Sequence, residues 1–178
     1  MDIFAHALWV GAGTTLLKRK KKISKRTMWA AIVLTVAPDI PLFIPVLLWA
    51  LSPAGSFKLF FNYIFTTPGN EPNIPESVIF ISHHLHCVTH SVVVAGVITL
   101  LVWAYLRRFP VLILGWWIHI FIDIFTHSKE YYAVPILYPF TERAFNGVAW
   151  ISPWFLAINY MILTFIYLGL YFTRTRTL

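Results

Sequence analysis

Charged residues are scarce in this chain. Of its 178 residues, 12% are Asp, Glu, Lys or Arg and 58% are hydrophobic, whereas a soluble domain carries about 25% charged residues. The mean hydropathy of +0.71 therefore excludes an ordinary soluble domain and indicates a protein of the lipid bilayer. Cysteine is also scarce: Cys87 is the only one, which excludes an internal disulfide. No basic segment precedes the first apolar run, so we expect no cleaved signal peptide.

Long apolar runs, in contrast, are abundant. A transmembrane helix needs roughly 20 apolar residues, and four segments are about that long: 27–51, 77–106, 109–127 and 153–173. A fifth run, 3–17, would rise only about 22 Å as a helix. We therefore predict an all-α, integral membrane helical bundle with about five transmembrane helices, and a single domain over residues 1–178 with no internal repeat.

The positions of the basic residues predict an orientation. Seven of the 14 Lys and Arg residues lie within 18–26, and four more are Arg107, Arg108, Arg174 and Arg176. With five spans, all three groups fall on one side, and the positive-inside rule assigns that side to the cytoplasm. The N-terminus is then outside and the C-terminus cytoplasmic. A basic run beside a membrane helix contacts anionic lipid more often than nucleic acid, so we expect no nucleic-acid partner.

The few ionisable groups inside the apolar runs are clustered. All seven histidines and all three aspartates lie in four short stretches. Imidazoles and carboxylates are the ligands that Zn²⁺, Mn²⁺ and Fe²⁺ bind. A carboxylate at the bilayer centre costs about 2.5–3.5 kcal/mol, and Asp39 and Asp123 have no Lys or Arg at matching depth. We therefore predict a bound divalent metal ion, Zn²⁺ first and Mn²⁺ second. The predicted ligands are Asp2, His6, Asp39, His86, His90, His119, Asp123 and His127.

Helix geometry predicts where these groups meet. At 1.5 Å per residue from the cytoplasmic end of each helix, His119 lies about 15 Å up, Asp39 about 18 Å and His90 about 26 Å. In a hydrocarbon core about 30 Å thick, the site should then open to the exoplasmic side. Residues four apart share a helix face. The pairs with this spacing are Asp2/His6, His86/His90, His119/Asp123 and Asp123/His127.

Other roles stay open for some of these residues. His83 and His127, near the water interface, fit structural histidines equally well. Asp123 could orient His119 without touching a metal ion. Asp39 lies in the segment APDIP, where Pro38 and Pro41 should break the helix, so its carboxylate could instead cap that break.

Two loops differ in their expected roles. The loop 128–152 is too apolar for an ordinary solvated loop, and we predict that it caps the site and offers Lys129 and Arg143 to an anionic substrate. A segment that lies on the membrane surface explains it equally well. The loop 52–76, with four prolines, is predicted to be irregular.

Several of these motifs together resemble the YdjM-like family of LexA-binding inner-membrane proteins. The resemblance runs in order along nearly the whole chain. Pro41 stands where the family often has a second Asp, and the stretch that begins at His86 lacks the family's Arg and Gly. The similar segments are MDIFAHALWVGAG at 1–13, APDI at 37–40, HCVTHS at 86–91, HIFIDIFTH at 119–127 and LYPF at 137–140.

The resemblance implies a metal-dependent hydrolase of the phospholipase kind in the bacterial inner membrane. A looser similarity is to zinc-dependent phospholipase C. The departure at His86 leaves open whether His84 or His86 stands in for the family's first histidine, and Pro41 removes one carboxylate from a two-metal site. The ligands or ligand partners that the family pattern implies are His6, Asp39, His90, His119 and Asp123.

These observations favour a membrane-bound hydrolase that cleaves a phosphoester of a lipid or lipid-like substrate at the outer face by metal-activated water. In this hypothesis Asp39, or a carboxylate that does not bind the metal ion, accepts the proton of the water, and His84 or His86 protonates the leaving group. One alternative is a divalent-metal or proton transporter, which the scarcity of polar residues in the cytoplasmic halves of the helices disfavours. Another is a non-catalytic membrane scaffold with a structural metal ion.

Overall fold

The computed structural model describes residues 1–20, 23–66, 70, 72–109 and 111–175. No β-strand occurs in these described ranges, which confirms the predicted all-α class. The elements in chain order are α1 (Ile3–Lys20), α2 (Lys25–Val36), the 3₁₀ turn η1 (Ala37–Asp39), α3 (Ile40–Ala50), α4 (Phe57–Ile64), α5 (Glu76–Thr89), α6 (Val92–Leu106), the 3₁₀ turn η2 (Val111–Ile113), α7 (Leu114–Thr126) and α8 (Pro153–Thr175).

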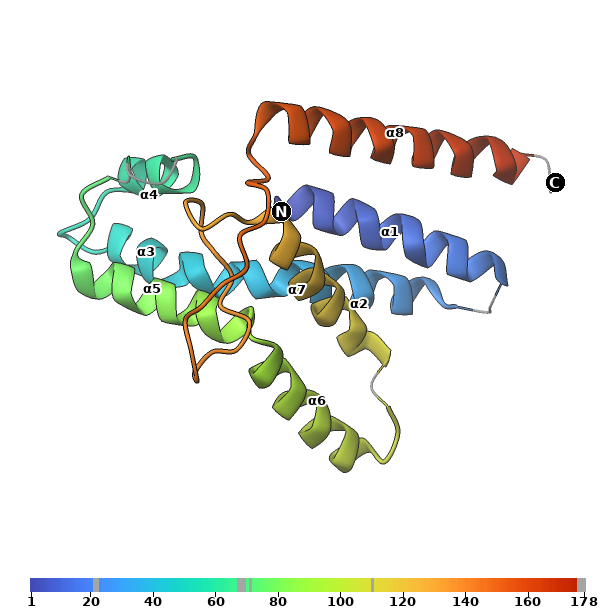
Figure 1. The fold of residues 1–178 in the computed structure, drawn as a ribbon, viewed down its shortest axis with the longest axis horizontal. Helices are drawn as coiled ribbons and strands as arrows, with labels where there is room; N and C mark the ends of the chain where they lie inside the picture. Colours follow the sequence, from blue (N-terminus) through green and yellow to red (C-terminus); the bar gives the residue numbers. More distant parts are fainter. Residues whose placement is uncertain (21–22, 67–69, 71, 110, 176–178) are drawn as a thin grey trace.

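Three of the helices form a layer. Helix α1 packs against α2 on one side and α8 on the other, and the three run side by side (Figure 1). Helix α7 crosses α2, while α3 continues the line of α2 and pairs with α5. Small apolar cores join them: Met1, Ala5 and Leu163 connect α1 to α8. This arrangement leaves the N-terminus, the start of α3 and the end of α7 near the middle of the molecule.

The helices identify a membrane protein. By length and composition, Lys25–Ala50 (α2 through α3) and Pro153–Thr173 within α8 could each cross a bilayer. The bent pair α5 and α6 counts as a third span if it is treated as one. Two or three candidate spans are thus found among the described residues, and the predicted number of about five is not confirmed.

The predicted single helix over 77–106 is wrong. The chain bends by 59° between α5 and α6, and Ser91 lies at the break. Its Oγ accepts hydrogen bonds from the backbone N–H groups of Val93 and Val94, at 3.1 and 3.2 Å, and donates to the carbonyl of Tyr138 at 2.6 Å. A serine in this N-cap position satisfies the first amides of a helix and so favours a new start there.

The proline pair around Asp39 breaks the helix, but gently. Residues Ala37–Asp39 form a 3₁₀ turn in which the N–H of Ile40 bonds to the carbonyl of Ala37, because Pro41 has no N–H to offer it. The turn also exposes the carbonyl of Pro38, which accepts the hydroxyl of Thr89 at 2.8 Å. Asp39 is therefore held at the junction of α2, α3 and the end of α5.

Replacing Thr89 by Val should loosen this junction. Valine keeps the shape of threonine but removes the bond to Pro38, and a net hydrogen bond contributes about 1 kcal/mol to the free energy of unfolding. Denaturation in detergent measures the change. Thr14→Val is the control, because the hydroxyl of Thr14 bonds only within α1, to Val10 at 2.8 Å and Gly11 at 3.1 Å. Equal losses in both variants would contradict a bridging role for Thr89.

Helix α4 was not predicted. The loop 52–76 was expected to be irregular, but Phe57–Ile64 is helical, and Ser56 accepts the N–H of Lys58 at its start. Its aromatic residues recur at helical spacing, so that Phe57 contacts both Phe60 and Phe61. The four prolines of this loop all lie outside the helix, which explains why they do not prevent it.

The loop 128–152 folds back on the start of α6 and the end of α7. The N–H of Gly147 bonds to the carbonyl of His127 and that of Trp150 to Thr126, both at 2.9 Å. On the other side of the loop, the carbonyl of Ile136 accepts the N–H of Val92 at 2.9 Å. The loop thus lies against the residues that follow His90 and Asp123.

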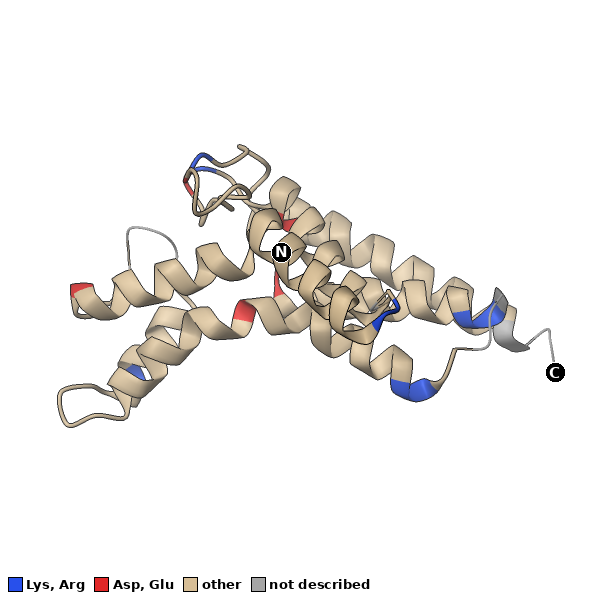
Figure 2. Cartoon of the chain, turned by 90° about the horizontal axis from the view of Figure 1, so that it is seen from below, with Lys and Arg blue, Asp and Glu red and all other residues tan. Residues whose placement is uncertain are grey.

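Four basic residues lie together at one end of the helical layer. Figure 2 shows blue segments there, close to the C-terminal end, and further blue segments elsewhere in the molecule. Lys18 and Arg19 end α1, while Lys25 and Arg26 begin α2. Arg19 ties α1 to the end of α8, since its guanidinium donates to the hydroxyl of Thr173 and to the carbonyl of Leu170, both at 2.7 Å. One end of the α1, α2 and α8 layer is therefore strongly positive.

Candidate metal centre

Four side chains from three parts of the chain meet in the middle of the molecule. Asp39 comes from η1, His90 from the end of α5, and His119 and Asp123 from one face of α7. One nitrogen or oxygen of each lies within 4.8 Å of the others. The i, i+4 spacing on α7 and the convergence of Asp39 with His90 bring together four of the eight predicted ligands.

The distances fit one metal ion. The Nε2 of His90 lies 3.4 Å from Oδ1 of Asp39 and 3.4 Å from Oδ2 of Asp123. The Nε2 of His119 lies 3.5 and 3.2 Å from the same two oxygens, and 2.9 Å from Nε2 of His90. Ligands about 2.0–2.1 Å from a tetrahedral Zn²⁺ are separated by about 3.3–3.4 Å. Five of the six donor–donor distances, from 2.9 to 3.5 Å, are therefore near the tetrahedral value, and the two carboxylate oxygens lie within 4.8 Å of each other.

Burial of the two carboxylates favours a bound cation here. The side chains of His90, His119 and Asp123 are 0% exposed and that of Asp39 is 13% exposed. Among the described residues, ion pairs join the two carboxylates only to histidines and to the α-amino group of Met1. Oδ2 of Asp39 and Oδ2 of Asp123 have no hydrogen-bond partner there. Buried, unsatisfied carboxylates of this kind are stabilised by a bound metal ion.

A hydrogen bond sets the tautomer of His90. Its Nδ1 lies 2.9 Å from the carbonyl of His86, so the ring donates its N–H there and directs the lone pair of Nε2 to the cluster. Metal-binding histidines commonly have such a partner on the second nitrogen. Because the chain bends after His90, the depth predicted for this residue is wrong. A straight helix would place His90 about 11 Å farther from the cytoplasmic side than His119. In the structure the rings of the two residues are in contact.

A second group of polar atoms surrounds the other oxygen of Asp123. Oδ1 lies 2.9 Å from Nε2 of His6 and 3.3 Å from the hydroxyl of Thr126, and it pairs with the α-amino group of Met1. That amino group is 2.9 Å from Nε2 of His127. The ring of His6 also stacks on that of His119 at 4.1 Å. His6 and His127 thus border the cluster and support the orientation of Asp123.

His86 borders the cluster on a different side. It is buried, with its ring centre 4.0 Å from that of His90 and 6.5 Å from that of His127. Neither of its ring nitrogens has a hydrogen-bond partner among the described residues. An imidazole buried with both nitrogens free is costly unless it meets a ligand or a water.

The remaining predicted residues lie elsewhere. Oδ1 of Asp2 accepts the N–H of Ala5 at 2.9 Å and the hydroxyl of Tyr160 at 2.7 Å, so this carboxylate joins the start of α1 to α8. Nδ1 of His84 donates to the carbonyl of Phe80 at 2.9 Å. The side chains of Lys129 and Arg143 are exposed on the loop 128–152.

Sequence reasoning missed three supporting groups. The α-amino group of Met1 and the hydroxyls of Thr89 and Thr126 contact the cluster or its neighbours. The position of Thr126, three residues after Asp123 on α7, was the available signal, because this spacing returns a side chain to the same helix face. Nothing in the sequence indicated the contact of Met1.

The fold and the cluster define a class: an all-helical membrane protein with a buried two-histidine, two-aspartate centre that could hold a metal ion. The model of a family described as YdjM inner membrane protein matches residues 1–177. The chain belongs to this family and is a protein of the inner membrane. The resemblance seen in its sequence motifs is thereby confirmed. No curated protein and no solved structure matched the chain.

Proposed function

We propose that this protein is a membrane-bound, metal-dependent hydrolase that cleaves a phosphoester of a lipid or lipid-like substrate at the outer face of the membrane. The observation that carries the proposal is the convergence of Asp39, His90, His119 and Asp123 at the spacing of a tetrahedral first shell. The nitrogen and carboxylate donors fit Zn²⁺ first and Mn²⁺ second.

In the proposed reaction, the residues of this chain have separate roles. When bound, a divalent ion supplies Lewis acidity to the phosphoryl group and lowers the pKa of a coordinated water toward 7. Asp39, the least buried member of the cluster, accepts the proton of the attacking water. His86 donates a hydrogen bond from its ring N–H to the leaving group, because neither of its ring nitrogens has a partner among the described residues and its ring lies against His90, whereas Nδ1 of His84 is bonded to the backbone. His6 and His127 position Asp123.

The same proposal includes an orientation. The basic ends of α1 and α2 are cytoplasmic under the positive-inside rule, so the metal centre belongs to the exoplasmic half. Five segments then cross the bilayer: α1, α2 with α3, α5 with α6, α7, and α8. Lys129 and Arg143 lie on the exoplasmic loop 128–152, where exposed cations attract an anionic head group.

Metal content and hydrolysis together test this function. Purified native protein is expected to hold about one transition-metal ion per chain and to hydrolyse a phospholipid in mixed micelles. Chelation should abolish the activity, and added zinc or manganese should restore it. A Lys129→Ala/Arg143→Ala double variant should keep its metal ion but require more anionic lipid for the same rate. Folded native protein that stays metal-free after incubation with zinc and manganese would refute the proposal.

One observation favours a second candidate, a structural metal ion in a non-catalytic protein. Four protein ligands would fill a tetrahedral shell, whereas catalytic zinc sites usually keep one position for water. Spectroscopy on Co²⁺-substituted protein separates the two functions. Catalysis requires a shell that takes up an added anion such as azide, with a change in the visible spectrum, while a closed structural site leaves the spectrum unchanged.

A further inference from the structure

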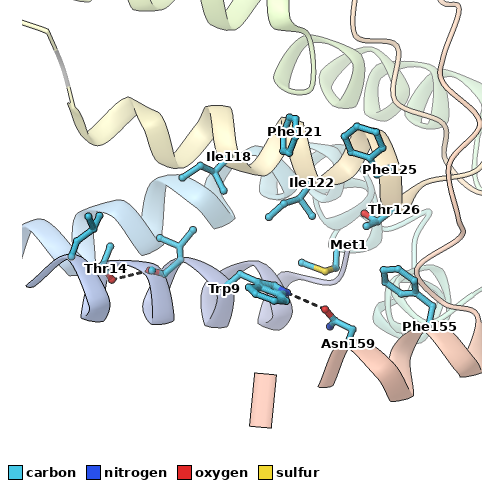
Figure 3. Close-up of a pocket in the computed structure, with 13 residues that line it drawn as sticks. Met1, Trp9, Thr14, Ile118, Phe121, Ile122, Phe125, Thr126, Phe155 and Asn159 are labelled. Atoms are coloured by element: carbon cyan, nitrogen blue, oxygen red, sulfur yellow. Dashed lines mark hydrogen bonds between the residues drawn. The ribbon is translucent and has the colours of Figure 1, made fainter. Parts of the chain in front are cut away.

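An apolar groove lies beside the metal centre. It has a volume of about 530 Å³ and is formed by one face each of α1, α7 and α8. Figure 3 shows Met1, Thr126, Phe155 and Asn159 at one end and Thr14 toward the other. The volume is within the usual range of small-molecule sites, about 300–1,000 Å³.

The groove suits hydrocarbon. Its sides carry exposed apolar side chains, among them Leu17, Phe121 and Phe125. The hydroxyl of Thr14 bonds to the carbonyl of Val10 at 2.8 Å, so it presents no unsatisfied donor. From Met1 to Leu17 the chain of α1 rises about 24 Å. This exceeds the depth of one leaflet, about 15 Å in a core about 30 Å thick.

One end of the groove adjoins the metal centre. Thr126 lines the groove, and its hydroxyl bonds to Oδ1 of Asp123 at 3.3 Å. Met1 lines it too, and its amino group contacts the same carboxylate. Met1 and Thr126 therefore link the lining of the groove directly to Asp123. A lipid whose tail occupies the groove brings its head group to this end.

A free hydrogen-bond donor lies at the same end. The Nε1–H of Trp9 donates to Oδ1 of Asn159 at 3.0 Å, which fixes the orientation of the amide. Its Nδ2 then has no hydrogen-bond partner among the described residues, although Asn159 is only 7% exposed. A buried N–H₂ group in an apolar groove requires an acceptor oxygen.

We propose that this groove binds one acyl chain of a bilayer glycerolipid, with the ester carbonyl accepting a hydrogen bond from Asn159 and the tail extending along α1 past Gly13. The proposal rests on the proposed function in taking the head group as the substrate of the metal centre. Binding of the tail, however, can be measured without any hydrolysis.

Two matched glycine variants test the position of the chain. A Cβ at Gly13 meets nothing within 4 Å, so the side chain of Gly13→Leu starts in open space and extends into the groove that Gly13 lines. Gly169 on α8 is equally open but does not line the groove, which makes Gly169→Leu the control. The probe is a phospholipid with a photoactivatable diazirine in its acyl chain, in vesicles, with labelled peptides identified by mass spectrometry.

Labelling of 9–17 and 118–126 is expected in the native protein and in Gly169→Leu. It should fall about tenfold in Gly13→Leu, because the leucine side chain displaces the acyl chain from part of its contact surface. Unchanged labelling in Gly13→Leu would overturn the proposal. So would protein–protein crosslinks through this face, which would assign the groove to a second copy of the chain.

A second comparison tests the ester contact. Native protein is expected to bind diester lipid about fivefold better than the diether analogue, as the loss of one hydrogen bond predicts. Asn159→Leu should abolish this preference, while Gly169→Leu, which lies outside the groove, should retain it. Equal binding of the two lipids by native protein would refute the role of Asn159. All variants should keep the native metal content, so a failure of the metal centre is recognised separately.

Discussion

Asp123→Asn is expected to empty the metal centre while leaving the fold intact. Both oxygens of this buried carboxylate are engaged: Oδ2 belongs to the four-donor cluster and Oδ1 receives His6 and Thr126. Asparagine keeps the size but removes the charge. Changes outside the first shell of a metal site typically cost 10–100-fold in affinity, so the loss of a direct ligand should cost more than about 100-fold.

The measurement is metal content by plasma mass spectrometry, combined with a zinc titration of the purified variant. Asp2→Asn is the matched control, since the carboxylate of Asp2 bonds to Ala5 and Tyr160, away from the cluster. This variant should keep its metal ion. If Asp2→Asn released the ion and a folded Asp123→Asn retained it, the assignment of the ligands would be wrong.

Gly115→Ala should strongly destabilise the protein. Gly115 is the point of closest approach of α7 to α2: an added Cβ would lie 2.7 Å from the carbonyl oxygen of Ala31 and 2.9 Å from Oγ1 of Thr35. Overpacking of this kind typically costs 1–3 kcal/mol. Because His119 follows one helical turn later on α7, the displacement should also weaken metal binding, by about tenfold for 1.4 kcal/mol.

Thermal unfolding in detergent and a competitive zinc titration measure the two effects. Gly96→Ala is the control, because a Cβ there meets only the ring of Trp117, at an ordinary 4.0 Å. The control should be as stable as the native protein or more so, since alanine favours helix by about 1 kcal/mol over glycine. Equal stability of both variants would show that α2 and α7 do not need this close contact.

The predictable parts of the structure follow from local patterns. Apolar length alone predicted α1, α7 and α8 to within a few residues, and the spacing of His119 and Asp123 put both on one face of α7. The break after His90 was not predictable in this way, because no Gly or Pro lies in or next to HCVTHS and a long apolar run follows it. The hydroxyl of Ser91 provides the new helix start, and its effect depends on the loop that supplies the carbonyl of Tyr138.

In the candidate site, too, some features follow from local sequence patterns and others depend on distant segments. Residue types and spacing indicated the right chemical groups, yet which of them share one ion depends on how distant segments cross. The spacing of His86 and His90 predicted one ligand pair on a helix face. In the structure His90 follows the last residue of α5 and contacts His119. His86 lies beside His90 and has no hydrogen-bond partner among the described residues. The spacing of Asp2 and His6 predicted that they act together. In the structure the carboxylate of Asp2 instead accepts hydrogen bonds from the N–H of Ala5, at the start of α1, and from the hydroxyl of Tyr160.

The ligands of the centre come from η1, α5 and α7, and this separation along the chain has a consequence for biogenesis. When the ribosome has made only the first half of the protein, Asp39 is already inserted, but its partners on α7 do not yet exist. Until α7 is made, we expect the carboxylate of Asp39 to stay near water or to pair transiently with lipid head groups, since a lone carboxylate in hydrocarbon costs free energy. In the proposed function, the metal ion can bind only when α7 has docked, and it stabilises only the completed fold. The amount of mature protein in the membrane should therefore rise and fall with the supply of zinc to the cell.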